Sequence, residues 1–207
     1  GKYYVKEKAT VDGFVLDDEA REIDLTYRDQ DTAEVTYSAD WQNNRQKAEV
    51  EVVKKEKDSD RVLEGAVFAL CAKDDITGAD GKVILKADTM IEELATDKEG
   101  KLTFTADLPI GFAYYIKETS PASGFATTDE TQEFTFEYGG AEKEKISYAF
   151  TFEDERTVIK ITKTSLTDGK ELEGAKLQVT DESGKVVDSW TSGKDAHIIK
   201  ELVVGQK

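Results

Sequence analysis

The stretch Tyr114-Tyr115-Ile116-Lys117-Glu118 combines β-branched and aromatic residues and ends in a carboxylate. Successive side chains of a β-strand point to opposite faces, so Glu118 would share a face with Tyr114 and Ile116. A core-facing acid is costly unless it is neutral, paired or chemically employed. The stretch therefore predicts a strand whose buried carboxyl group needs a partner elsewhere in the chain.

The chain repeats itself with a unit of about 110 residues, a period that marks repeated domains. A near copy of the stretch, Tyr3-Tyr4-Val5-Lys6-Glu7, lies 111 positions earlier. Leu63-Glu64-Gly65-Ala66 recurs as Leu172-Glu173-Gly174-Ala175, 109 positions later. The same protein unit is therefore expected to occur more than once in the chain.

The repeat begins and stops in the middle of a unit. Residues 1–47 correspond to the second half of a unit, residues 48–156 make one complete unit, and residues 157–207 correspond to a first half. We therefore expect one complete domain between two half-domains, which would read as one domain if they were joined.

Short runs with strand character fill the central unit, and no strong helical period is present. Expected strands cover residues 48–54, 65–73, 101–106, 114–118, 132–138 and 146–153, with a short one at 83–85; residues 90–95 fit either a helix or a strand. Many short strands separated by turn residues predict an all-β fold, an antiparallel β-sandwich.

Composition excludes several classes of function. The chain has 28 Lys and Arg against 44 Asp and Glu, a net charge of −16, which opposes binding to nucleic acid or to an anionic membrane. No run of about 18 apolar residues predicts membrane insertion, and no leader-like N-terminus is present, as in a cytosolic protein or a piece of a longer one. The 38% of hydrophobic residues can supply a core.

Motifs for catalysis, cofactors or metals are missing from the sequence. Cys71 is the single cysteine, which excludes intrachain disulfides and thiolate zinc sites, and its apolar surroundings favour a packing role. His197 has no triad partner nearby and is interpreted as a strand residue. Asp74, Asp75 and Asp80 lack the spacing of an EF-hand calcium loop and are interpreted as a solvated turn. We therefore expect no enzyme, no cofactor and no metal.

Three inward-facing polar residues stand out in the central unit. Lys54 shares a strand face with Val50 and Val52, and Asp154 ends the aromatic row of the last strand, while Glu118 lies on a middle strand. The two half-units, if joined, offer the equivalent set Lys163, Glu7 and Asn43, whose Asn43 ends the row Tyr37, Ala39 and Trp41. The interval from the glutamate to the Asp or Asn is 36 residues in both sets.

Such a set can form an amide bond or a buried salt bridge. Burial lowers the pKa of an amine and raises that of a carboxyl, so a free amine could attack a carboxyl carbon while a neutral glutamate polarises it and moves the proton. The fold would supply the proximity. The alternative is a salt-bridge cluster of Lys54 with one or two carboxylates.

The order of these elements resembles the Cna-B-like, or prealbumin-like SpaA-type, repeats of Gram-positive surface proteins and pilins. The matching features are a strand lysine, Leu-x-Gly-Ala, Tyr-Tyr-x-Lys-Glu with a Gly-Phe loop, and a last strand ending in Asn or Asp. The resemblance implies a self-formed isopeptide bond between Lys54 and Asp154 with Glu118 as proton shuttle. The departure is Asp154, because most members carry Asn there, and an Asp would lose water instead of ammonia.

The resemblance further implies a structural stalk repeat of an extracellular, cell-wall-anchored adhesin or pilus-like protein. Its partners would be neighbouring repeats. The alternative function is a binding module for a host ligand or glycan, using inter-strand loops such as residues 74–82. The bond would close a loop of about 100 residues, worth about 4–5 kcal/mol by the loop-entropy relation for disulfides.

The two half-units at the ends of the chain allow two interpretations. Either Lys163 of one chain meets Glu7 and Asn43 of the next, giving head-to-tail self-association, or the chain is a window on a longer repeat array. The sequence alone leaves both open.

Overall fold

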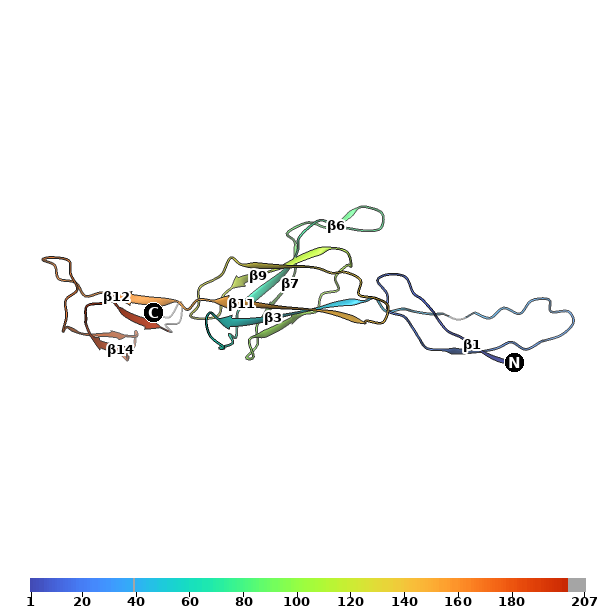
Figure 1. Ribbon diagram of the computed structural model, residues 1–207, viewed down its shortest axis with the longest axis horizontal. Helices are drawn as coiled ribbons and strands as arrows, with labels where there is room; N and C mark the ends of the chain where they lie inside the picture. Colours follow the sequence, from blue (N-terminus) through green and yellow to red (C-terminus); the bar gives the residue numbers. More distant parts are fainter. Residues whose placement is uncertain (39, 201–207) are drawn as a thin grey trace.

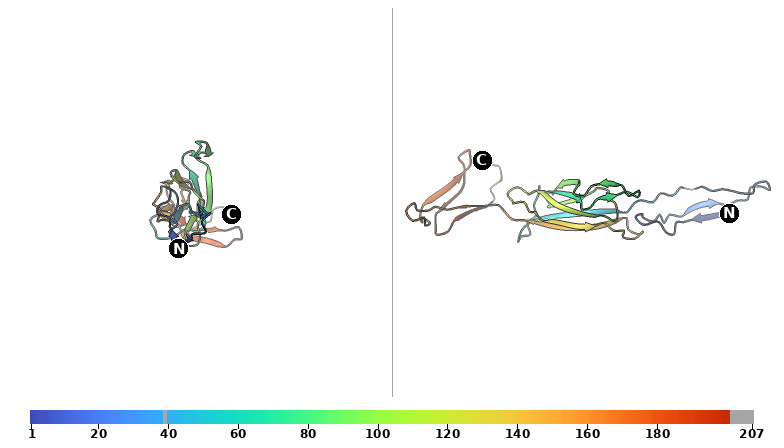
Figure 2. Two further views of the ribbon diagram at one scale, coloured as in Figure 1. Left: turned by 90° about the vertical axis from the view of Figure 1, so that its right-hand side faces the viewer. Right: turned by 90° about the horizontal axis from the view of Figure 1, so that it is seen from above.

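A computed structural model describes residues 1–38 and 40–200 and shows an elongated, all-β chain with no helix in those ranges. Three parts follow one another along the long axis, with the N-terminal part and the C-terminal part on opposite sides of the central one (Figure 1). The view from above shows the same row (Figure 2). We call residues 1–47 the N-terminal half-unit, residues 48–156 the central unit, and residues 157–200 the C-terminal half-unit.

The central unit contains nine strands, and each half-unit contains a few short ones. The bounds are β1 Lys2–Val5, β2 Arg21–Asp24, β3 Lys47–Glu56, β4 Val67–Ala72, β5 Ile76–Thr77, β6 Val83–Leu85, β7 Met90–Ala95, β8 Lys101–Phe104, β9 Ala113–Ser120, β10 Thr131–Thr135, β11 Lys145–Asp154, β12 Val158–Ile161, β13 Lys176–Thr180, β14 Val186–Thr191 and β15 His197–Lys200. The ambiguous run at residues 90–95 is a strand, β7.

Two sheets make up the central sandwich. One has the order β10-β9-β4-β7 and the other the order β11-β3-β8, while the β5–β6 hairpin stands out from the body (Figure 1). The all-β sandwich expected from the sequence is confirmed. Its buried apolar core comes from both sheets and includes Val50, Val52, Leu63, Phe68, Leu70, Phe104, Tyr114, Ile116, Phe136 and Phe152.

The first and last strands of the central unit are direct neighbours. β3 and β11 pair in parallel over their full length, with Lys54 opposite Phe152 and Glu56 opposite Asp154, while the other strand pairs are antiparallel. A parallel pair cannot be closed by a hairpin, so the whole intervening chain forms the connection between these two strands. The chain consequently enters at one end of the sandwich and leaves at the other.

Both half-units repeat the local structure of the central unit. Tyr3 pairs with Ile23 in the β1–β2 hairpin, as Tyr114 pairs with Phe134 in β9–β10. In the C-terminal half-unit the Ser192 hydroxyl donates to the Leu172 carbonyl and accepts from the Ala175 N–H. Thr96 makes the same two contacts with Leu63 and Ala66.

The equivalent of β11 in the N-terminal half-unit is the row of Tyr37, Ala39, Trp41 and Asn43. In contrast to β11, the described residues of this row form no strand, and Ala39 lies outside the described residues. The reason is the missing neighbour, because β11 depends on β3 for its hydrogen bonds. The equivalent of β3 is β12, which lies in the half-unit at the other end of the chain (Figure 1).

A hydrogen-bonded junction holds the N-terminal half-unit to the central unit. The buried Gln46 side chain donates to the carbonyls of Gly140 and Lys143 and accepts the Gly139 N–H at 2.8 Å. The Leu16 N–H adds a bond to the Ala141 carbonyl. These bonds join backbone groups of the central unit to the Gln46 side chain and the Leu16 backbone of the N-terminal half-unit, so we expect the junction to restrict bending between the two parts.

None of the described segments is a helix long and apolar enough to cross a membrane.

Candidate functional site

Lys54 lies on β3 with its whole side chain buried. The strand alternates from Val50 through Val52 to Lys54, all facing the core, whereas Lys55 is only partly buried. The centroid of the Phe68 ring, on the opposite sheet, lies 5.5 Å from the Lys54 amine nitrogen. An amine in these surroundings has lost its water and needs protein partners.

Glu118 supplies one partner from the other sheet. It follows Tyr114 and Ile116 on the inward face of β9, and its side chain is fully buried. Its Oε1 lies 3.1 Å from the Lys54 Nζ. Its Oε2 accepts the backbone N–H of Thr128 at 3.2 Å, which fixes the direction of the carboxyl.

Asp154 supplies the other partner from β11. Its Oδ1 lies 2.5 Å from the Lys54 Nζ, and both side chains are fully buried. The parallel pairing of β3 and β11 brings the two together, because Lys54 and Asp154 occupy adjacent positions on the inward face of that pair. The structure thus unites the lysine, glutamate and aspartate singled out in the central unit.

The charges of this cluster do not balance, with two carboxyls beside one amine. Burial raises the pKa of the Asp154 carboxyl to about 6; the Lys54 amine lowers that pKa and the Glu118 carboxylate raises it. Asp154 Oδ2 is buried and has no hydrogen-bond partner among the described residues, and the contact of Glu118 Oε1 is the ion pair with Lys54. A buried carboxyl group with a raised pKa and an unpartnered oxygen is a candidate for a reacting group rather than for a permanent salt bridge.

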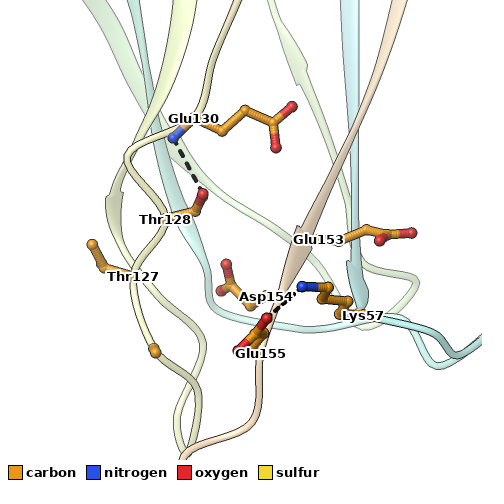
Figure 3. A pocket seen from close by; sticks show the side chains of 8 residues that line it. Lys57, Thr127, Thr128, Glu130, Glu153, Asp154 and Glu155 are labelled. Carbon is orange, nitrogen blue, oxygen red and sulfur yellow. Dashed lines mark hydrogen bonds and ion pairs between the residues drawn. The ribbon is translucent and has the colours of Figure 1, made fainter.

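A pocket of about 330 Å³ reaches Asp154 from the surface. Figure 3 shows the Asp154 carboxyl among the residues that line it, with Lys57 bound to Glu155 at one side. Its lining residues are Lys57, Ala126, Thr127, Thr128, Glu130, Glu153, Asp154 and Glu155. The pocket lies beside the cluster, whose three side chains are themselves fully buried.

The second set of predicted residues is divided between the two ends of the chain. Asn43 donates through Nδ2 to Glu7 Oε2 at 2.7 Å, so two of its members are in contact within the N-terminal half-unit. Lys163 lies just after β12, in the C-terminal half-unit, on the other side of the central unit (Figure 1). A single chain does not bring Lys163 to Glu7 and Asn43.

Sequence reasoning missed the backbone donors that aim the two glutamates. Thr128 N–H binds Glu118 Oε2, and at the equivalent place 111 positions earlier Asp17 N–H binds Glu7 Oε2 at 2.9 Å. A backbone donor has no preferred residue type, so only the constant repeat spacing could have pointed to these positions.

The cysteine, the histidine and the acidic turn of the sequence lie outside the cluster. Cys71 is a buried thiol in β4. His197 begins β15, pairs with Asp188 at 2.7 Å and stacks on Trp190. Asp80 accepts the Lys82 N–H in the turn between β5 and β6, and the described residues contain no cluster of metal-ligating side chains.

Comparison with known proteins gives a family and several similar structures. The family model of the SpaA prealbumin-like fold domain matches residues 48–149. The Bacillus anthracis TIE protein is 27% identical with a TM-score of 0.59, and the alignment covers 98% of this chain and 34% of that one. No curated protein sequence matches the chain.

Two pilins are further similar structures. The group B streptococcus pilus 2b backbone protein is 19% identical with a TM-score of 0.41, covering 68% of this chain and 45% of that one. The streptococcal ancillary pilin is 22% identical with a TM-score of 0.38, covering 98% of this chain and 63% of that one. The chain thus spans about a third of the TIE protein and less than half of the pilus backbone protein.

The matched residues cover most of the central sandwich and include Lys54 and Glu118, but end before Asp154. Residues 48–149, which make up most of the central unit, therefore belong to the SpaA prealbumin-like fold domain family.

Proposed function

We propose that the chain is a structural stalk segment of a Gram-positive cell-surface protein, in which Lys54 and Asp154 form an amide cross-link. The observation that carries the proposal is the buried contact of the Lys54 amine with Asp154 Oδ1 at 2.5 Å, beside Glu118 at 3.1 Å. The match of residues 48–149 to the SpaA prealbumin-like fold domain family supports the location outside the cell.

Glu118 acts as the proton shuttle of this single reaction. Its carboxyl touches the amine from one side and is held by the Thr128 N–H from the other. The amine needs to lose a proton before it attacks Asp154, and the leaving oxygen needs to gain one. Since the fold already holds the reacting groups in contact, no cofactor is required.

The cross-link would carry tension across the domain. Force enters at the start of β3 and leaves at the end of β11, which lie at opposite ends of a parallel pair. A bond from Lys54 to Asp154 passes that force directly between the two strands. The sequence between residues 54 and 154 is then bypassed, so pulling cannot unravel it.

Intact mass under denaturing conditions tests the bond. We expect a deficit of one water in the wild-type chain, and the full calculated mass in Lys54→Ala and Glu118→Ala. Lys55→Ala, which alters the neighbouring lysine outside the cluster, is the matched control and should keep the deficit. A wild-type chain of full calculated mass would overturn the cross-link.

Force spectroscopy tests the stalk role separately. The wild-type central unit should not lengthen when it is pulled, whereas Lys54→Ala should release about 100 residues, or about 340 Å of chain. Equal extension of the two proteins would show that the bond does not carry the force.

We further propose that the two half-units complement each other between copies of the chain. Apolar residues of the half-units are exposed to solvent, whereas the equivalent residues of the central unit are buried. Tyr3 is 54% exposed against 0% for Tyr114, and Ile159 is 43% exposed against 1% for Val50. In the central unit, the faces that carry these residues cover one another. Glu7 and Asn43 of one copy would then receive Lys163 of the next.

Denaturing gels test this association. Wild-type chains should give a ladder of cross-linked species, which Lys163→Ala abolishes. Lys160→Ala, an exposed lysine of β12, is the control and should leave the ladder intact. A single monomer band at high wild-type concentration would overturn the association while leaving the Lys54–Asp154 bond untouched.

A further inference from the structure

One histidine connects the two sheets of the C-terminal half-unit. β12 and β15 form one of these sheets, and β13 and β14 form the other (Figure 1). From β15, the His197 ring stacks on Trp190 of β14, with the ring centroids 4.1 Å apart and the ring planes 8° apart. Its Nε2 lies 2.7 Å from Asp188 Oδ2, also on β14. One side chain therefore makes two contacts between sheets that share no strand pairing in the described residues.

His197 occupies a position that is apolar in the central unit. It lies opposite Ile161 in the β12–β15 pair, as Leu102 lies opposite Val52 in the β3–β8 pair. Leu102 is buried and belongs to the hydrophobic core of the central unit. A titratable ring therefore stands at an inward-facing position where the complete sandwich has a leucine.

The two partners of His197 also replace residues of the central unit. By strand register, Trp190 takes the position of Leu94, and Asp188 takes the position of Glu92. Glu92 accepts two backbone N–H groups, at 2.8 and 2.9 Å, at the end of β8. In the C-terminal half-unit, an aromatic stack thus stands in place of two leucines, and the carboxylate binds an imidazole instead of the backbone.

The imidazole is the member of this group that changes charge near neutral pH. The hydrogen bond from His197 lowers the pKa of the Asp188 carboxyl against the opposing effect of burial, so the carboxylate is ionised between pH 5 and 8. An imidazole ordinarily gains its proton within that range. The protonated ring makes a charge-assisted hydrogen bond to the carboxylate and places a cation against the indole, and both contacts are stronger than those of the neutral ring.

The neighbouring segments leave Asp188 as the charged group that contacts His197 in the described residues. Ile161 faces it from β12, and Leu177 lies on the inward face of β13. The charged residues of β12, β13, β15 and the turn before β15 are exposed to solvent. They are Lys160, Lys176, Lys194, Asp195 and Lys200.

We propose that His197, Asp188 and Trp190 form a pH-dependent contact between the two sheets of the C-terminal half-unit, which holds the sheets together in acid and loosens as the imidazole loses its proton. The sign follows from the pairing. A carboxylate partner favours the charged imidazole, so the stabilisation is present in acid and is lost as pH rises. This part of the chain contains neither Lys54 nor Asp154, so the proposal is independent of their cross-link.

Hydrogen exchange of the full chain measures the opening of this contact, because amides exchange when the strands that protect them open. The protection of β14 and β15 is compared at about pH 5.5 and about pH 7.5, on either side of an ordinary imidazole titration, after correction for the intrinsic exchange rate. Asp188→Asn keeps a hydrogen-bonding group but removes the charge. His197→Leu introduces the residue that the central unit has at the equivalent position. The amides of β8, which carries Leu102, are the internal control.

Protection of β14 and β15 in the wild-type chain should be about fivefold higher at the acid pH, as expected when a neutral hydrogen bond gains a charge. Asp188→Asn and His197→Leu should each remove most of this difference, and β8 should show none. Equal protection at the two pH values in the wild-type chain, or a difference that persists in a folded His197→Leu chain, would overturn the proposal.

Fluorescence tests the stack without altering any of its three residues. The chain has two tryptophans, so Trp41→Phe leaves Trp190 as the single indole. Its emission should change between the same two pH values, because the ring stacked on it gains a charge. Emission that is constant with pH in the folded Trp41→Phe chain would also overturn the proposal.

Discussion

The central unit and the two half-units contain nearly the same sequence elements, but only the central unit forms a complete sandwich with a buried core. Tyr114 and Tyr3 occupy the same hairpin register, but Tyr114 is buried while Tyr3 is exposed. Likewise, β11 is a ten-residue strand, whereas its counterpart before Asn43 is not a strand in the described residues. Hairpin register is therefore local, while burial and the long parallel strand require the other half of the domain.

The largest expected effect comes from removing the central lysine. Lys54→Ala should destabilise the central unit by about 4–5 kcal/mol through the lost cross-link, and further through two carboxyls left without a cation. Lys163→Ala, the equivalent change in the open C-terminal half-unit, should alter monomer stability by less than about 0.5 kcal/mol. Urea unfolding of dilute protein measures both, and equal losses would contradict the contrast between closed and open units.

The aromatic core gives the next largest difference. Tyr114→Ala removes a fully buried ring whose hydroxyl donates to the Pro109 carbonyl, and should cost about 3–5 kcal/mol. Tyr3→Ala should cost less than about 0.5 kcal/mol in the monomer. Urea unfolding measures both costs. A large loss of stability from Tyr3→Ala would show that the N-terminal half-unit buries this ring in solution.

The junction should show an intermediate effect. Gln46→Ala leaves the backbone groups at residues 139–143 without their side-chain partner, and should cost about 1–3 kcal/mol. Small-angle scattering should also show a wider range of angles between the N-terminal half-unit and the central unit. Gln42→Ala, an exposed neighbour, should change neither measurement; a straight Gln46→Ala chain would mean that other contacts hold the junction.

The smallest expected effect compares two equivalent arginines. Arg156 binds Glu56 through two nitrogens, at 2.9 and 2.7 Å, and its hydrogen bonding and charge lower the pKa of Glu56. Glu56→Gln should therefore cost about 1 kcal/mol, whereas Asp107→Asn, at the more exposed pair with Arg45, should cost less than about 0.5 kcal/mol.

The pH dependence of the Glu56 contribution has a definite sign. Its folded pKa lies below the unfolded value, so the stabilisation is present above the unfolded pKa and is lost as pH falls through the folded pKa. Melting temperatures of wild type and Glu56→Gln should converge on acidification. A difference that grows in acid would exclude the ion pair as its source.

Much of the central site was predictable because strand periodicity is a local property. The alternation of Val50, Val52 and Lys54 selected Lys54 over Lys55, and the alternation before Glu118 predicted its inward direction. The repeat located the second set of residues through its constant spacing. The Thr128 N–H and the Gln46 contacts could not be predicted, because backbone partners have no residue signature.

Sequence alone determined most strands of the central unit, the inward direction of their side chains, and that Lys54, Glu118 and Asp154 belong to one set, since each follows from a two-residue period and an internal repeat. Only the tertiary structure decided that the first and last strands are parallel neighbours, which brings Lys54 against Asp154. Contacts between distant strands depend on the whole fold, and so does the protonation of a group buried among them.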